Sequence, residues 1–242
     1  MENTTLVALS QQMVLRRQMD VIANNIANAD TGGYKSERML FATYLQDIGR
    51  REKAAFVQDI AVTRDPRDGE MVVTGNPFDM AIQGEGYFQV ETPDGVRYTR
   101  GGHFRLDDQG VLVTSDGHAL LGDDGFPVIT SPDDNDLVVT PDGTVSAGGF
   151  EIARLQVVTF ERPNALRETY GGLYQTDLTP LPSEDARIVQ GSIESSNVEP
   201  IVEMTRMIAL LRGYQSVQRL VQEQDQLRRR AISALSGTNR TA

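Results

Sequence analysis

The fold is decided at Ala23-Asn24-Asn25-Ile26-Ala27-Asn28-Ala29-Asp30-Thr31-Gly32-Gly33-Tyr34-Lys35 (residues 23–35), where an N-terminal helix-forming run ends. Apolar residues before and within this stretch recur at steps of four, three and four, the spacing of a helix that packs along another helix. They are Leu15, Met19, Ile22 and Ile26. A second short stripe points roughly 140° away, since each residue turns a helix by ~100°. It consists of Leu6, Leu9 and Met13.

Two stripes indicate neighbours on more than one side, because a helix against a single core needs only one. Asn24, Asn25 and Asn28 form the polar part of the last turns. Residues 30–33 are expected to end the helix, with Gly32 as its left-handed residue. One interpretation is a terminal helix docked on its own domain. The other is an assembly helix that completes its contacts only between subunits.

Composition narrows the class of protein. The chain has 242 residues, enough for one large domain or two small ones with a genuine core. Its net charge of −11 argues against nucleic-acid and membrane-surface binding, because both surfaces are anionic. The absence of cysteine excludes disulfides and thiolate metal sites.

Export and membrane signals are also absent from the pattern. No apolar stretch at the start precedes a small-residue cleavage site, so no cleaved secretory signal is expected. No run approaches the ~20 apolar residues that a membrane-spanning helix needs, so no membrane insertion is expected.

The middle of the chain changes character twice. Residues 1–47 are expected to hold the N-terminal assembly helix and a following turn. Residues 48–75 are polar and charged and are interpreted as a connector, with a candidate short strand at Ile60-Ala61-Val62. Residues 76–185 show short β-branched or aromatic runs bounded by turns, which predicts an antiparallel β domain, either a sandwich or a partly open barrel. The expected strands include 86–90, 96–100, 111–114 and 155–158.

Four Asp-Gly pairs fit the tight hairpins of such a domain, since glycine supplies positive φ angles. They begin at Asp94, Asp116, Asp124 and Asp142.

Residues 186–242 are expected to form the C-terminal long assembly helix. Asn197 is a candidate cap, Pro200 fits the first turn, and the helix should run from Val198 to about Leu235. Its apolar residues repeat at three and four, and glutamines form a polar, uncharged flank. A helix this long cannot be sheltered by the β domain, so the N-terminal helix is its obvious partner. The fold class is therefore α+β, with paired, coiled-coil-like terminal helices and an inserted β domain.

Three stretches resemble the signatures of bacterial flagellar rod and hook proteins. The first is Ala-Asn-Asn-Ile-Ala-Asn followed by Thr-Gly-Gly-Tyr-Lys, within residues 23–35. The second runs from Phe78 to Val90 and continues through Tyr98-Thr99-Arg100 to Thr114. The third is Gln190-Gly191-Ser192-Ile193-Glu194-Ser195-Ser196-Asn197-Val198, with the helix after it. Length and a modest central domain look most like the proximal-rod members, with the distal-rod members as close runner-up.

This resemblance implies a structural protein and no enzyme. Such proteins pass unfolded through the flagellar type III export apparatus without a cleaved signal. They then assemble with copies of themselves and with other rod proteins into a hollow, torque-transmitting shaft across the periplasm, in the basal body. We expect the following subunit-assembly residues: Leu9, Met13, Leu15, Met19, Ile22, Asn24, Asn25, Ile26, Asn28, Met204, Met207, Ile208, Leu210, Leu211, Tyr214, Val217 and Val221.

Patterns for chemistry are weak. His103 and His118 with Asp116 are a poor metal site, and the acidic runs at 107–108 and 133–136 lack the calcium-loop pattern. No nucleotide-binding loop or nucleophile motif is present, so no catalytic residue, cofactor or metal is expected. The rival hypothesis is a secreted β-domain enzyme or binding module that its helices dimerise.

Overall fold

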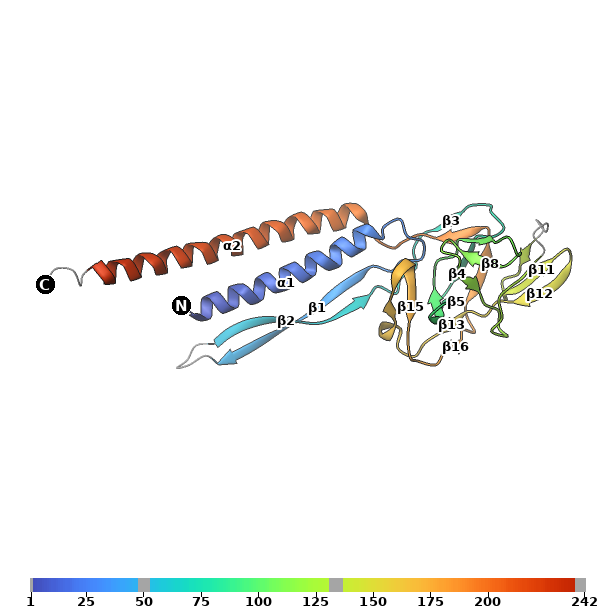
Figure 1. Cartoon of the computed structure of the whole chain (residues 1–242), viewed down its shortest axis with the longest axis horizontal. Helices are drawn as coiled ribbons and strands as arrows, with labels where there is room; N and C mark the ends of the chain where they lie inside the picture. Colours follow the sequence, from blue (N-terminus) through green and yellow to red (C-terminus); the bar gives the residue numbers. More distant parts are fainter. Residues whose placement is uncertain (1, 48–52, 131–136, 238–242) are drawn as a thin grey trace. The chain divides into compact units, whose positions relative to one another are not determined.

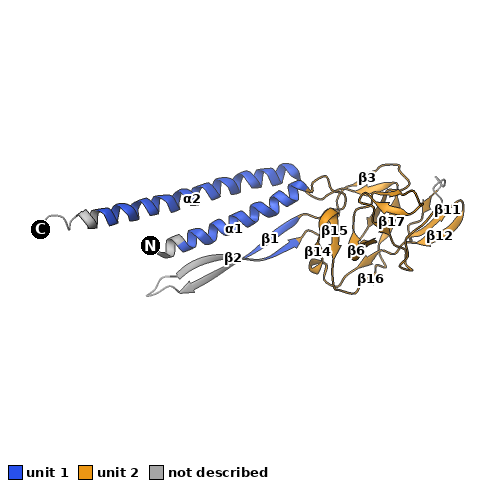
Figure 2. Cartoon of the chain, viewed as in Figure 1, with its two compact units in different colours: residues 1–27, 37–63, 199–242 blue, residues 28–36, 64–198 orange. Residues whose placement is uncertain are grey.

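The computed structural model describes the backbone of residues 2–47, 53–130 and 137–237, and the side chains of residues 6–41, 61–130 and 137–233. The chain divides into two compact units (Figure 2). Unit 1 contains residues 1–27, 37–63 and 199–242, and unit 2 contains residues 28–36 and 64–198. Each unit is built from segments that are far apart in the sequence.

Unit 1 contains the two helices and a two-stranded sheet. Helix α1 spans Glu2–Ala27 and helix α2 spans Pro200–Gly237, and they lie side by side (Figure 1). Their directions are opposite, because Ile22 shares a cavity with Glu203, whereas Leu15 lies opposite Gly213. The predicted long C-terminal helix is confirmed, and Pro200 is its first residue.

The sheet of unit 1 pairs strands β1 (Glu37–Asp47) and β2 (Lys53–Arg64). The sequence suggested only a short strand at 60–62 in this part of the chain, and β2 is much longer. Charged and apolar residues mix without clean alternation in both strands, so the two-residue period of a half-buried strand is not visible.

Unit 2 is an antiparallel β region of several sheets rather than a closed barrel, among the residues that the structure describes. Its largest sheet has the order β14-β15-β6-β5-β9-β8-β7. These strands are β5 (Phe88–Thr92), β6 (Gly95–Thr99), β7 (Phe104–Leu106), β8 (Leu112–Thr114), β9 (Ala119–Leu120), β14 (Arg167–Glu168) and β15 (Leu173–Gln175). The predicted antiparallel β region is therefore confirmed.

Smaller sheets complete unit 2. They are β10 (Val138–Val139), β11 (Thr144–Ala147) and β12 (Phe150–Arg154) in one sheet, β13 (Val158–Thr159) with β16 (Leu181–Pro182), β4 (Met80–Gln83) with β17 (Arg187–Gln190), and β3 (Met71–Val73) with β18 (Ser192–Glu194). Two short 3-10 helices, Pro163–Ala165 and Tyr170–Gly172, lie in its loops. In β3–β18 and β4–β17, an early strand of the unit pairs with a late one, as expected of an inserted domain.

The core of unit 2 is apolar and aromatic. Phe88 and Phe104 pack edge-to-face with ring centroids 5.5 Å apart, a geometry that aromatic pairs favour. A smaller cluster contains Tyr98 and Phe160, whose centroids are 4.8 Å apart. The glycines of all four Asp-Gly pairs have positive φ, between 78° and 102°, which confirms their predicted turn geometry.

Three local expectations need correction. The left-handed residue after α1 is Gly33, with φ of 72°, and not Gly32; Gly33 also lies so close to the Arg100 backbone that a Cβ would overlap it. Residues 155–157 form no strand, and β13 begins only at Val158. The Asn197 side chain does not cap α2, since it bonds to backbone groups of Ser36, Asp65 and Arg67.

Candidate assembly surface

The inner stripe of α2 holds one set of predicted assembly residues. Met207, Leu210, Tyr214 and Val221 are half-buried, and Val217 is 7% exposed. Along the sequence these residues are separated by three, four, three and four positions, so their side chains share one face of the helix. That face also carries Glu203, which is buried and accepts a hydrogen bond from Arg206 at 2.5 Å.

The inner stripe of α1 is similar. Leu15, Met19, Ile22 and Ile26 are all half-buried. A cavity of about 120 Å³ lies where α1, β1 and α2 meet inside unit 1. Its walls include Ile22, Glu203 and Arg206.

The asparagines of α1 have different surroundings. Asn25 is buried and binds the backbone of Glu37 twice: its Oδ1 accepts from the amide at 2.8 Å, and its Nδ2 donates to the carbonyl at 2.9 Å. These bonds attach the start of β1 to α1. Asn24 is exposed and Asn28, which belongs to unit 2, is half-buried.

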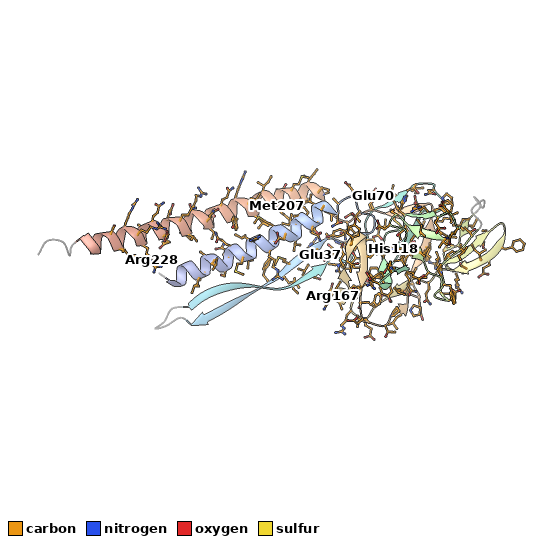
Figure 3. The ribbon with its side chains drawn as sticks, in the orientation of Figure 1. Glu37, Glu70, His118, Arg167, Met207 and Arg228 are labelled. Atoms are coloured by element: carbon orange, nitrogen blue, oxygen red, sulfur yellow. The ribbon has the colours of Figure 1, made fainter. Side chains whose placement is uncertain are left out.

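The remaining predicted residues form exposed apolar stripes. On α1, Leu9 and Met13 are exposed, and so is Leu6 one turn earlier; the exposed fraction of Met13 is 66%. On α2, Met204, Ile208 and Leu211 are exposed, and Ile201, which the prediction omitted, is 81% exposed. Each of Met204, Ile208 and Leu211 follows an inner-stripe position by one residue, so this stripe is turned by roughly 100° from the inner one. Side chains project all around α2, from Met207 to Arg228 (Figure 3).

The sequence patterns did not predict a charge cluster in unit 2, although its members lie in or near the three signature stretches. We use this name for Lys35, Asp68, Arg100 and Glu194. The Glu194 carboxylate accepts from Lys35 Nζ and from Arg100 Nε, both at 2.6 Å. Asp68 Oδ1 accepts from Lys35 Nζ at 3.0 Å and from Arg100 Nη2 at 2.8 Å. Only Asp68 is half exposed, at 49% of its side chain, and the other three are buried.

Backbone groups complete the coordination of this cluster. Arg100 donates to the carbonyls of Gly84 and Gly86, both at 2.8 Å, and Glu194 also accepts from the amide of Gly69 at 2.9 Å. Buried charges persist when they are paired and fully hydrogen-bonded in this way. Each charge sits in a short polar motif, so no periodicity in the sequence reveals that the four residues meet.

One of the candidate metal ligands, His103, has another partner. His103 Nδ1 lies 2.7 Å from Oδ1 of the buried Asp79, and Oδ2 of Asp79 accepts a hydrogen bond from the Thr74 hydroxyl at 2.6 Å. In the described part of the chain, no group of three or more His, Cys, Asp or Glu side chains could hold a metal ion. The acidic run at 133–136 lies outside the described residues.

Two tyrosines of unit 2, Tyr87 and Tyr98, have raised pKa values. Burial raises the pKa of Tyr87, and nearby Arg64 and Arg100 oppose that shift. Burial alone raises the pKa of Tyr98. Both shifts follow from the cost of placing a phenolate in an apolar environment.

Neither helix, over its described length, carries an apolar run that meets the requirements for crossing a bilayer.

Three protein-family models match the chain. The model described as flagella basal body rod protein matches residues 6–35, the flagellar hook protein FlgE/F/G D1 domain matches 81–147, and the flagellar basal body rod FlgEFG protein C-terminal matches 189–234. These matches overlap the three signature stretches, which the structure places on α1 and the segment after it, on the first half of unit 2, and on β18 with α2.

Relatives with curated names agree with the family models. The chain is 37% identical to the flagellar basal-body rod protein FlgF of Caulobacter vibrioides, over 99% of this chain and 100% of the relative. It is 30% identical to FlgF of Rhizobium meliloti, over 98% of this chain and 100% of the relative. It is also 30% identical to FlgG of Bacillus subtilis, over 87% of this chain and 90% of the relative. The chain belongs to the flagellar basal-body rod protein family, whose members are structural proteins of the basal body.

Proposed function

We propose that this chain is a subunit of the proximal rod, which polymerises through its terminal helices into a hollow, torque-transmitting shaft. The observation that carries the proposal is the pair of exposed apolar stripes on α1 and α2. Full-length similarity to proteins named FlgF favours the proximal position over the distal one. The assembly role is assigned to residues 1–47 and 186–242, with 48–75 as connector and 76–185 as outer domain.

The inner stripes support a coiled-coil-like pairing of α1 with α2 inside each subunit. Steps of three and four on both helices are the spacing of such a seam, with Leu15 facing Gly213. The outer stripes are then free to pack on neighbouring subunits. The helices of successive subunits would surround the central channel.

The size of the stripes argues for more than one neighbour. The exposed side chains are Leu6, Leu9, Met13, Ile201, Met204, Ile208 and Leu211. Fully burying such a side chain contributes about 1.5–3 kcal/mol, so covering their exposed halves gives roughly 5–10 kcal/mol in total. Bringing two subunits together costs an estimated 4–15 kcal/mol. A single contact of this kind barely offsets that cost, whereas a polymer shares it among several contacts.

The other steps of the proposal come from the family. The chain is exported unfolded by the flagellar type III apparatus without a cleaved signal. It joins the rod in the periplasm, next to other rod proteins, where binding to its neighbours stabilises the folded ends. Folding of the ends and polymerisation are then linked events.

Sedimentation of the purified chain tests the proposal, with and without residues 1–35 and 198–242. We expect concentration-dependent polymers, or co-assembly with other rod proteins, that require both ends. A discrete dimer with no larger species would contradict the proposal and favour a secreted module that its helices dimerise.

A further inference from the structure

The charge cluster gathers segments from both ends of unit 2. Lys35 belongs to the segment 28–36, at the start of the unit, and Glu194 ends β18, near its last residues. Arg100 follows β6, and Asp68 precedes β3. The cluster therefore joins the first and last segments of the unit, which are 159 residues apart at Lys35 and Glu194.

The charges in the cluster depend on one another. Two cations, Lys35 and Arg100, face two carboxylates, and only Asp68 is half exposed. Without the Glu194 carboxylate, the two buried cations would share Asp68 as their remaining acidic partner in the cluster. Leaving a charge buried without its partner is strongly unfavourable, so the docking of Lys35 depends on β18 being in place. The reverse also holds, because Glu194 is buried.

Backbone bonds run beside the cluster and join the same two segments. The Gly33 amide donates to the Glu194 carbonyl at 2.8 Å, and the Asn197 amide donates to the Tyr34 carbonyl at 3.2 Å. The Ser36 amide donates to Asn197 Oδ1 at 2.7 Å. These amides are therefore protected from exchange with solvent only while the two segments are docked on each other.

We propose that Glu194, together with Lys35 and Arg100, forms a latch that makes residues 28–36 and 192–198 open and close as one unit. Glu194 is the positioning residue, since it contacts both buried cations and is itself buried, whereas Asp68 is half exposed. When the latch opens, strands β5 and β6 stay paired with each other. This coupling goes beyond rod assembly and does not depend on it, because every residue involved belongs to unit 2 of a single chain.

Hydrogen exchange on the full-length chain tests the latch from both of its ends. In Glu194→Gln, which removes the charge and keeps the shape, we expect exchange at Gly33 and Ser36 to accelerate by about tenfold or more, because a buried pair has lost one partner. In Lys35→Met, we expect a similar acceleration at Asn197. Exchange in β5 and β6 should stay as in the parent chain in both variants.

The matched control is Glu184→Gln, at an exposed glutamate ten residues before Glu194, which should leave all of these amides unchanged. Asp68→Asn, at the half-exposed member, should accelerate both segments by a smaller factor. Acceleration confined to the segment that carries the substitution would overturn the proposal. So would equal acceleration in β5 and β6, because Glu194 would then be a general stability residue.

Discussion

Lys35 Nζ lies 2.6 Å from Glu194 Oε1, and both side chains are buried, although they are 159 residues apart in the chain. This ion pair joins the N-terminal and C-terminal signature stretches. Arg100, from the central stretch, completes the arrangement with its own bond to Glu194. Three stretches that are separate in the sequence are therefore parts of one buried charge cluster.

Arg100→Leu should lower the free energy of unfolding of unit 2 by about 3–5 kcal/mol, because it leaves Glu194 with a missing partner in a buried site. Denaturant unfolding measures this. The control is Arg229→Leu on α2, which breaks an exposed pair with Asp225 and should cost at most about 0.5 kcal/mol. Similar losses in the two variants would mean that the buried cluster adds nothing to stability.

Gly33→Ala and Gly75→Ala separate backbone strain from steric overlap. Both glycines have φ of 72°, but a Cβ on Gly33 would lie 2.5 Å from the Arg100 carbonyl carbon, whereas a Cβ on Gly75 meets no atom within 4 Å in the described structure. We expect Gly75→Ala to cost about 1–2 kcal/mol from its φ angle alone. Gly33→Ala should cost about 1–3 kcal/mol more, because the neighbouring backbone must shift. Equal costs in thermal unfolding would contradict the close approach at Gly33.

Ile208→Asp should block polymerisation while leaving the fold intact. Ile208 is 52% exposed in the isolated chain, so its charge remains solvated there and becomes costly only when another subunit covers it. Sedimentation and circular dichroism together measure the two effects. Ser216→Asp, at an exposed polar position of the same helix, is the matched control and should assemble normally. Normal assembly of Ile208→Asp would remove this stripe from the interface.

Asn25→Ala should destabilise unit 1 by about 1–3 kcal/mol, because it leaves the backbone groups of Glu37 without two hydrogen bonds. Exchange at the Glu37 amide should accelerate accordingly. Asn24→Ala, at the exposed neighbouring position, should have a smaller effect on both measurements. If both variants exchange alike at Glu37, the Asn25 side chain does not hold β1.

Alkaline pH should destabilise unit 2 through Tyr87 and Tyr98. Their pKa values in the folded chain lie above the ordinary value of 10.0, so the folded state keeps its phenolic protons when the unfolded state loses them. This contribution to stability is complete below about pH 10 and is lost as pH rises through the folded pKa. A Tyr87→Phe, Tyr98→Phe double variant should show a shallower decline in unfolding free energy above that pH. An identical slope would contradict the raised values.

Much of the fold follows from local sequence patterns. The three- and four-residue steps predicted both helices, and α2 has the predicted length because no proline follows Pro200 and Gly213 alone interrupts the run before Gly237. The Asp-Gly pairs predicted four turns because positive φ is a property of the single residue. The paired strands β1 and β2 escaped prediction because they show no clean alternation of apolar and polar residues.

The sequence by itself determined the two apolar stripes of α1, the repeating apolar residues of α2, the short antiparallel strands and the family, since these depend on periodicity and on short motifs. Only the tertiary structure decided which stripe is covered inside the chain, that Asn25 holds β1, and that Lys35, Arg100 and Glu194 share one buried site. The physical reason is that burial and ion pairing depend on distances between segments far apart in the chain, whereas helical period and turn conformation depend on neighbours.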